Sequence, residues 1–250
     1  MKAGRKILYR NFMTFLSLAG VLAIVLPIFL SSGSWPDTAR NYLEQNGFIE
    51  TGARNLVSAI YLGYRAFDTL GETIVLLVAV SGTIGIISHS GISLARGYGR
   101  EEESQSSKKS LLQIKRTELL DVVTGKMGPI VLIFGLYVML YGHLSPGGGF
   151  QGGVVIASGI VFLALGSKND SSIRLQEAPV LARIEASGFL MLIIASLIGI
   201  PGGAGFFGNP LSSSEEFKVG YIIILNSIIG LKVGAGIGYM CVAMLGREAT

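Results

Sequence analysis

The sequence predicts an all-α integral membrane protein with about six transmembrane helices and both termini in the cytoplasm. Half of the 250 residues are hydrophobic and only 14% are charged, whereas a soluble domain usually carries about 25% charged residues. Apolar runs that approach the length of a membrane span recur along the whole chain. Lys and Arg residues are also distributed unevenly between the segments that join these runs.

Six apolar runs define the predicted membrane helices. The first run follows four basic residues, as the core of a signal peptide would. However, its stretch from Phe12 to Leu30 exceeds the roughly 7–15 apolar residues of such a core, so we expect a retained anchor. The six predicted segments are about 11–30, 69–88, 127–143, 153–166, 185–200 and 220–245.

The basic residues predict the topology of these helices. With the N-terminus inside, fifteen of the twenty Lys and Arg residues fall in cytoplasmic segments and four fall in outer segments. The remaining one, Lys232, lies within the last predicted helix. Because cytoplasmic segments of membrane proteins carry an excess of Lys and Arg, this distribution predicts a cytoplasmic location for both termini.

A short amphipathic helix is predicted on the outer side at about 54–67. Apolar residues recur there at spacings of three and four, which places them on one face of a helix. Such a helix would lie along the outer surface and lead into the second membrane segment. The apolar positions are Leu56, Ile60, Tyr64 and Phe67.

The chain divides at a polar segment. Residues 99–110 read Gly-Arg-Glu-Glu-Glu-Ser-Gln-Ser-Ser-Lys-Lys-Ser, which combines low hydrophobicity with high charge. This composition predicts a flexible cytoplasmic linker over 99–114. We therefore expect a two-helix unit at 1–98 and a four-helix unit at 115–250, as if two subunits had been fused.

Acidic residues enter the second membrane segment. On a continuous helix Arg65, Asp68 and Glu72 would share one face, with Glu72 about 6 Å deeper than Asp68. A carboxylate inside a membrane helix is costly unless it pairs or meets water, so these residues are candidates for an ion pathway in which Arg65 modulates the charge. The alternative is a helix start that is stabilised by acidic residues and a surface ion pair.

Lys232 is a second candidate for the ion pathway. Its charge lies near the middle of the last predicted helix, where a basic side chain costs roughly 3 kcal/mol. Gly230, Gly234 and Gly238 form a ridge of small residues on the opposite side, which is typical of close helix packing. We therefore expect this helix to be enclosed on both sides, partly by other chains. Snorkelling to the surface is disfavoured so far from either helix end.

A glycine-rich segment at 143–153 separates the third and fourth predicted membrane helices. The apolar run that follows it, Val154 to Gly166, would span only about 20 Å of a hydrocarbon core about 30 Å thick. The segment should therefore lie partly at membrane depth as irregular backbone that is buried against protein. His143 could titrate near neutral pH or merely cap a carbonyl at the helix end.

Other residues have structural interpretations. We expect Glu185 to begin the fifth helix and interact with its dipole. Cys241, the one cysteine, is expected to be a small apolar residue in the last helix. Gly147-x-Gly149-x-x-Gly152 matches a dinucleotide fingerprint by chance, because no strand precedes it. We expect no cofactor, no metal site and no nucleic-acid binding.

The residues from Tyr141 to Val154 closely resemble the signature of the B subunit of Mrp-type sodium/proton antiporters. The same MnhB-like domain occurs in membrane-bound hydrogenase and sulfane-sulfur reductase complexes, and the resemblance extends over about 115–245. In that family the domain has four helices and serves mostly assembly and support. The residues that carry the resemblance are Pro146, Gly147, Gly148, Gly149, Phe150, Gln151, Gly152 and Gly153.

A second resemblance covers about 50–90. The run from Arg65 to Glu72 is similar to the C-terminal end of the large antiporter A subunit, which in hydrogenase-type complexes is a separate MbhE-like subunit. This resemblance implies a sodium or proton route through Asp68 and Glu72. It also implies a fused chain in the prokaryotic plasma membrane, with the lipid bilayer, Na+, H+ and A-, C-, D-, E-, F- and G-like subunits as partners.

Three hypotheses about function follow from these patterns. The first is a non-catalytic subunit of an Mrp-type antiporter that contributes to the ion path and to assembly. The second is the same module in the membrane arm of a redox complex. The third is a structural scaffold whose polar residues only make contacts between chains.

Overall fold

The computed structural model describes residues 2–30, 37–97, 118–166, 177–210 and 215–245. The described residues form helices and turns without strands, which confirms the predicted all-α class. They separate into a first unit at residues 1–41 and a second unit at residues 42–250, each with its own contacts. The predicted linker at 99–114 lies outside the described residues.

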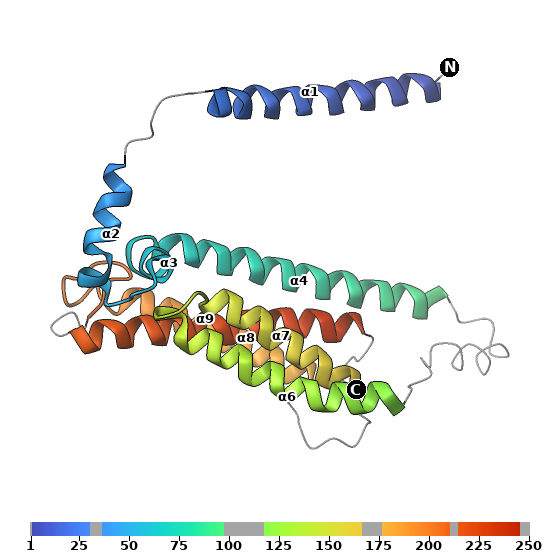
Figure 1. Ribbon diagram of the computed structural model, residues 1–250. Coiled ribbons are helices and arrows are strands. Elements are labelled where there is room, and N and C mark those ends of the chain that lie inside the picture. Colours follow the sequence, from blue (N-terminus) through green and yellow to red (C-terminus); the bar gives the residue numbers. More distant parts are fainter. Residues whose placement is uncertain (1, 31–36, 98–117, 167–176, 211–214, 246–250) are drawn as a thin grey trace. The chain divides into compact units, whose positions relative to one another are not determined.

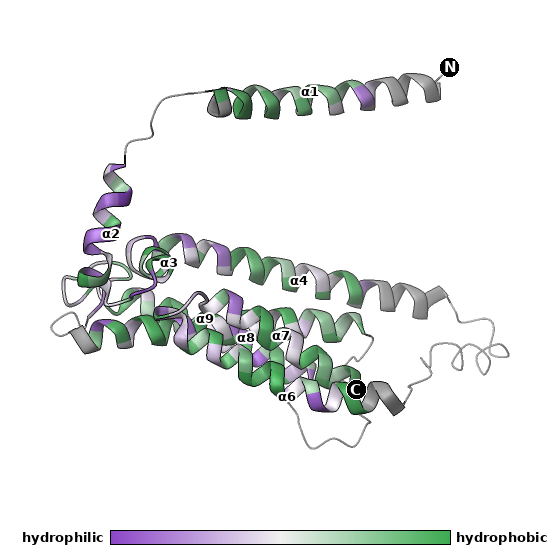
Figure 2. Cartoon of the chain, in the orientation of Figure 1, coloured by the Kyte–Doolittle hydropathy of each residue, from purple (hydrophilic) through white to green (hydrophobic). Residues whose placement is uncertain are grey.

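The first unit contains α1 (Lys2–Leu30) and the first residues of α2 (Thr38–Thr51). The apolar stretch of α1 runs from Asn11 to Pro27 and includes most of the first predicted membrane segment. Its large side chains, such as Phe15 and Leu18, are exposed, as expected of a helix that is solvated by lipid or covered by other chains. Figure 2 shows the apolar residues of this stretch in green along α1. Helix α2 was not predicted, because its residues are mostly polar and show little apolar periodicity.

The second unit is a bundle of five membrane-spanning helices. They are α4 (Ala66–Gly97), α6 (Glu118–Leu140), α7 (Gly149–Gly166), α8 (Ala178–Leu197) and α9 (Glu215–Met244). Each is long and apolar enough to cross a membrane, and α9 is the most buried of the five. Helices α4, α7 and α8 pack around α9, and α6 packs mainly against α7. The chain is thus a multi-pass membrane protein with α9 at the centre of this bundle.

Five of the six predicted membrane segments lie in these five helices, but α7 differs from the prediction at its start. It begins at Gly149 rather than near 153, so it has 18 residues and a length of about 27 Å. The irregular backbone expected within 143–153 is therefore confined to a shorter stretch. Only residues 144–148 leave the helical conformation. Glycine is a poor helix former, but here its small size permits backbone contacts that offset its entropy cost.

The helix predicted at 54–67 is present as two short pieces, α3 (Leu56–Ser58) and η1, a π-helix (Ala59–Tyr64). The face that turns into the bundle differs from the predicted apolar face. Ala59, Leu62 and Ala66 are buried, whereas Phe67 is 69% exposed. The wider turn of a π-helix shifts the register, so a spacing of three and four no longer follows one face.

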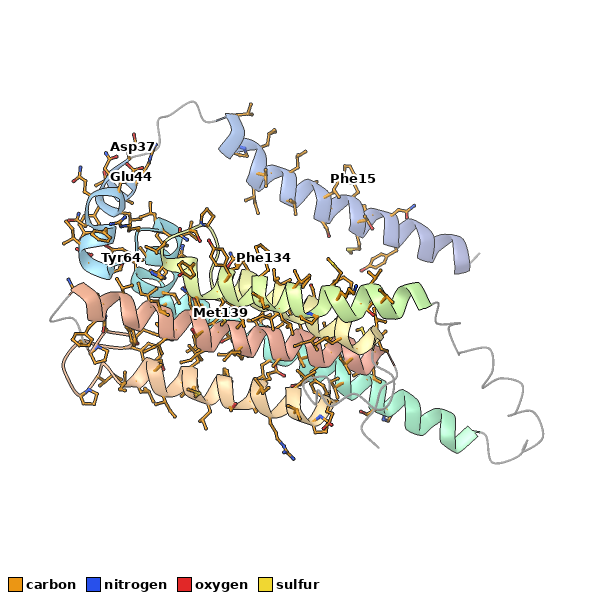
Figure 3. The ribbon with its side chains drawn as sticks, turned by 60° about the horizontal axis from the view of Figure 1, so that its bottom comes forward. Phe15, Asp37, Glu44, Tyr64, Phe134 and Met139 are labelled. Atoms are coloured by element: carbon orange, nitrogen blue, oxygen red, sulfur yellow. The ribbon has the colours of Figure 1, made fainter. Side chains whose placement is uncertain are left out.

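Glycines at every seventh residue join α6 to α7. On α6 these are Gly128 and Gly135, with Gly142 in the 3-10 turn that follows, and on α7 they are Gly152, Gly159 and Gly166. A Cβ at Gly135 would lie 2.9 Å from the backbone nitrogen of Ile156, and one at Gly152 would lie 2.8 Å from that of Met139. The two backbones therefore approach too closely for any other residue at these positions. In Figure 3, Met139 turns into the bundle, whereas Phe134 points away from it.

Candidate functional site

The glycine-rich loop is held by side chains from the short helices that precede α4. The Asn55 side-chain amide donates to the carbonyl oxygens of Gly142 at 2.8 Å and Ser145 at 2.9 Å. The Ser58 hydroxyl donates to the same Gly142 oxygen at 2.6 Å. The Asn55 backbone N–H donates to the His143 carbonyl at 3.0 Å. These bonds satisfy carbonyls that the end of α6 leaves without helical partners.

A second polar network lies beneath this loop. The Asn226 side-chain oxygen accepts hydrogen bonds from the Gly149 N–H at 2.8 Å and from the Tyr61 hydroxyl. Burial raises the pKa of Tyr61, so its phenol stays protonated and donates. Gly148 has φ +150°, and a Cβ there would collide with the Tyr61 hydroxyl. The start of α7 thus contacts Tyr61 of the π-helix and Asn226 near the middle of α9.

Glycines also bring α7 into contact with α9. A Cβ at Gly149 would lie 2.7 Å from the carbonyl oxygen of Asn226, and one at Gly153 would lie 2.8 Å from that of Gly230. On α9, a Cβ at Gly234 would lie 3.1 Å from the Gly153 carbonyl oxygen. Gly238 lies against Ile160 one turn further along. The ridge of Gly230, Gly234 and Gly238 therefore faces α7 of the same chain.

Lys232 lies on the other side of α9 and is fully buried. Its ammonium group donates to the carbonyl oxygen of Thr73 on α4 at 2.6 Å. The Glu185 carboxylate of α8 lies 3.9 Å from the same ammonium, and the Phe189 ring lies 6.0 Å away. Figure 1 shows the course of α4, α8 and α9; a charge from each of α8 and α9 and a carbonyl from α4 thus meet inside the bundle.

This arrangement corrects two expectations. Glu185 does not begin a helix, because α8 starts at Ala178 and the carboxylate is only 4% exposed. Lys232 needs no other chain to enclose it, because α4 and α8 cover it. Two glycines provide space for the pair. A Cβ at Gly188 would lie 2.9 Å from the Cβ of Lys232, and one at Gly236 would lie 2.7 Å from Oε1 of Glu185.

The acidic residues of α4 lie on the surface of this chain. The helix does not continue through Arg65, which ends the π-helix with φ −125° and ψ 32°. Arg65 still pairs with Asp68 in the first turn of α4, and the two side chains are 70% and 49% exposed. Glu72 is exposed one turn further along. Asp68 and Glu72 therefore face lipid, water or another subunit rather than the interior of this bundle.

The other residues of the glycine motif have distinct positions. The His143 ring donates from Nδ1 to the carbonyl oxygen of Leu140 at 2.9 Å, since a carbonyl only accepts. This geometry is that of a cap at the end of α6. Phe150 packs against the buried core, whereas Gln151 and Pro146 are not part of it.

One cluster, at the end of the bundle where α4 begins, was missed by sequence reasoning. The Glu50 carboxylate accepts from the hydroxyls of Tyr42 at 2.7 Å and Tyr64 at 2.6 Å. The hydrogen bond from Tyr64, followed by that from Tyr42, lowers the pKa of Glu50. Glu50 and Tyr64 border a cavity of about 190 Å³ that also contacts Phe207 and Tyr221. Contacts between residues 8 and 14 positions apart carry no periodic signal in the sequence.

The described residues hold no group of three His, Cys, Asp or Glu side chains that could bind a metal ion.

Residues 119–239 match the family model described as a domain related to the MnhB subunit of Na+/H+ antiporters. This segment is an MnhB-like domain. It contains α6, α7, α8 and most of α9, so the glycine contacts and the buried Lys232–Glu185 pair lie inside it. Thr73, which accepts a hydrogen bond from Lys232, lies outside it.

Relatives of known sequence include proteins named as parts of antiporters. The B subunit of the Na+/H+ antiporter of Bacillus subtilis is 27% identical over 52% of this chain and 93% of its own length. The probable A/B subunit of a K+/H+ antiporter of Rhizobium meliloti is 24% identical over 72% of this chain but only 18% of its own length. An uncharacterized protein of Methanocaldococcus jannaschii is 28% identical over 73% of this chain and 74% of its own length.

Two solved membrane complexes contain chains with this fold. A chain of the archaeal membrane-bound sulfane sulfur reductase aligns with a TM-score of 0.67 and 25% identity, over 94% of this chain and 96% of that one. A chain of the Mrp complex from Dietzia sp. DQ12-45-1b aligns with a TM-score of 0.55 and 22% identity, over 91% of this chain but only 26% of that one. The helix arrangement is therefore shared with chains of multisubunit membrane complexes.

Proposed function

We propose that this chain is a subunit of a multisubunit Mrp-type cation/proton antiporter in the prokaryotic plasma membrane. The observation that carries the proposal is the MnhB-like domain, together with the likeness to a B subunit over nearly its whole length. The chain would contribute to assembly and to the path of Na+ and H+. It would work beside A-, C-, D-, E-, F- and G-like subunits.

The surface of α4 supports a position inside a larger complex. Asp68 and Glu72 are exposed on a helix that is long and apolar enough to cross the membrane. A carboxylate on such a helix is costly against lipid, because the hydrocarbon core does not solvate charge. Contact with water or with a polar group of a neighbouring subunit removes this cost. We therefore assign these two carboxylates to the proposed cation or proton route, with Arg65 as the partner of Asp68.

We also propose that the chain fuses two subunits, with a two-helix unit at 1–98, a linker at 99–114 and a four-helix unit at 115–250. The B subunit of Bacillus subtilis corresponds to about half of this chain, whereas the Rhizobium protein whose name joins A and B corresponds to a larger share. The MnhB-like domain begins only at residue 119. These coverages support an A-like segment before the domain.

A second candidate function is a membrane-arm subunit of a redox complex. It is favoured by the sulfane sulfur reductase chain, which aligns with this chain over nearly the full length of both. Purification in mild detergent, with identification of every co-purifying protein, separates the two candidates. Antiporter subunits alone are expected. Iron–sulfur subunits would favour the redox complex, and purification as a single chain would contradict both.

The proposed role of the α4 carboxylates has a direct test. Asp68→Asn and Glu72→Gln should each lower cation/proton antiport in vesicles at least tenfold, which corresponds to about 1.4 kcal/mol in the barrier. The complex should still assemble, because both side chains are exposed. Glu177→Gln, an exposed acidic residue before α8, serves as the matched control and should transport normally. Wild-type antiport in both α4 variants would remove these residues from the route. Loss of assembly together with transport would instead indicate a scaffold role.

A further inference from the structure

Lys232 and Glu185 form a buried pair that the exposed carboxylates of α4 do not explain. Lys232 is 0% exposed and Glu185 is 4% exposed. The ammonium donates to the Thr73 carbonyl, but Oε1 of Glu185 has no hydrogen-bond partner within the described structure. A buried carboxylate oxygen without a donor is costly, and native structures rarely keep one without a role.

Stability alone does not explain why the pair is kept. Replacing a buried ion pair by apolar residues of similar volume is often neutral or stabilising, because removing both charges from water costs as much as their attraction returns. The structure also reserves space for the pair with Gly188 and Gly236, each of which would place a Cβ within 2.9 Å of one partner. The buried charges and the space that the two glycines leave for them therefore both indicate a function.

The three helices place the pair between the two ends of the bundle. Thr73 is the eighth residue of α4, so its carbonyl lies about 10 Å along the helix from the end that carries Asp68. Glu185 is the eighth residue of α8 and lies about 10 Å from the start of that helix, at the opposite end of the bundle. Lys232, near the middle of α9, contacts both. The polar groups thus lie together in the apolar interior, about 10 Å along α4 and α8 from opposite ends of the bundle.

We propose that Glu185 and Lys232 are an intramembrane proton-exchange site of this chain. In the exchange an N–H bond of the Lys232 ammonium breaks and an O–H bond forms at Oε1 of Glu185. The ionic pair becomes a neutral amine and a neutral carboxylic acid, so the net charge of the site stays zero. Glu185 then releases the proton to water on the side where α8 begins, and Lys232 takes up another proton from water on the side of Thr73, which restores the carboxylate and the ammonium. This inference rests on the proposed proton route but adds a site that the α4 carboxylates do not supply.

The geometry allows this exchange with a small movement. Direct transfer needs a separation of about 2.7–2.9 Å between nitrogen and oxygen. The pair is now 3.9 Å apart. Because the Glu185 carboxylate lies against Gly236, its side chain can rotate without meeting a Cβ there. Lys232 is the charged group that faces Glu185 in the described residues. Helix α4 presents Thr73 and Val80 at this place, α8 presents Phe189, and Arg183 of α8 is not buried.

The test uses the purified complex in vesicles, with antiport measured as a function of pH. Glu185→Gln keeps the volume of the side chain but cannot exchange a proton, so antiport should fall at least tenfold while the complex still co-purifies, a loss equivalent to about 1.4 kcal/mol. Glu185→Asp should retain part of the activity with a displaced pH profile. The double variant Glu185→Gln with Lys232→Met carries no buried charge and should assemble well without regaining transport. Wild-type antiport with an unchanged pH profile in Glu185→Gln would overturn the proposal.

Two further measurements separate a proton site from a structural pair. Infrared difference spectra across a pH titration should show a carboxylic acid band that is lost in Glu185→Gln and permanently present in Lys232→Met. Absence of any band that depends on Glu185 would overturn the proposal. Gly236→Ala should slow antiport by crowding Oε1, whereas Gly220→Ala on the same helix, where a Cβ meets nothing within 4 Å, should not. Equal antiport in the two glycine variants would also count against it.

The failure of this inference can be distinguished from the failure of the proposed function. If co-purification identifies no antiporter proteins, the proposed function fails, but the infrared titration still reports whether Glu185 holds a proton. If antiport depends on Asp68 and Glu72 but not on Glu185, only the further inference fails.

Discussion

Single residues connect the proposed two-helix unit to the proposed four-helix unit at the start of α7. Asn226 and Tyr61 are 165 positions apart, yet their side chains share one hydrogen bond at the start of α7. The Asn226 oxygen also accepts the Gly149 N–H, which as a helix-start donor has no partner within α7. A buried amide in this position acts as a helix cap supplied by another helix.

This cap leads to a prediction about stability. Asn226→Leu should lower the stability of the purified protein by about 1–3 kcal/mol per orphaned group, because it leaves the Gly149 N–H and the Tyr61 hydroxyl unpaired. Tyr61→Phe should cost only about 1 kcal/mol, because Gly149 keeps its acceptor. Thermal melting in detergent measures both variants. A larger loss for Tyr61→Phe than for Asn226→Leu would contradict the assigned cap.

The stability contributed by the Glu50 cluster has a defined dependence on pH. Hydrogen bonds from Tyr64 and Tyr42 lower the pKa of Glu50 in the folded state, so its contribution to stability is complete above the pKa of the unfolded chain. That contribution is lost as pH falls through the lowered folded value. The melting temperature of the wild type should therefore drop more steeply below about pH 5 than that of Glu50→Gln. Parallel curves for the two proteins would argue against the assigned hydrogen bonds.

At the scale of elements, glycine spacing determines how closely helices pack. Gly135 and Gly152 face each other across α6 and α7, and each would place a Cβ within 3.2 Å of the other's carbonyl oxygen. Without large side chains between them, the two helices gain dispersion contacts along the whole seam. Glycines that resemble a flexible loop in the sequence therefore build a tight contact between helices.

A matched pair of substitutions on α6 tests this seam. Gly135→Ala should destabilise the protein by about 1–3 kcal/mol, because backbone atoms of α7 cannot yield to the added methyl group. Gly125→Ala lies on the same helix with nothing within 4 Å of its Cβ, and should stabilise it by up to about 1 kcal/mol. Melting temperatures of the two variants in one detergent compare them directly. Equal effects would show that helix propensity rather than packing dominates.

At the scale of the whole molecule, interactions between the two proposed halves lead to another prediction. Hydrogen bonds join the first half to the second through the side chains of Asn55, Ser58 and Tyr61. The Thr73 carbonyl of the first half also accepts a hydrogen bond from Lys232. A chain divided within 99–114 and expressed as two polypeptides should therefore co-purify as a pair. Substituting Asn55 and Ser58 by alanine should weaken recovery of the pair more than recovery of the intact chain. Failure of the unsubstituted fragments to associate would show that these bonds do not hold the halves together.

Much of this fold could be predicted from the sequence, because apolar length and charge asymmetry are local properties. Five membrane segments, their approximate bounds and the all-α class follow from them. The helix ends were less accurate. Gly149 to Gly153 have poor helix propensity but become helical through contact with α6 and α9. The buried face of residues 56–64 was also missed, because no spacing rule signals a π-helix.

The candidate site was only partly predictable for the same reason. The sequence by itself determined that Lys232, Asp68 and Glu72 stand at membrane depth or at its edge, since their positions in apolar runs require it. Only the tertiary structure decided their surroundings. It enclosed Lys232 with Glu185 and Thr73 and left Asp68 and Glu72 on the surface. The depth of a residue in the membrane depends on its neighbours along the chain. Its pairing depends on which faces of distant helices meet. In this protein the glycines decide which faces meet, because they let the helix backbones approach each other.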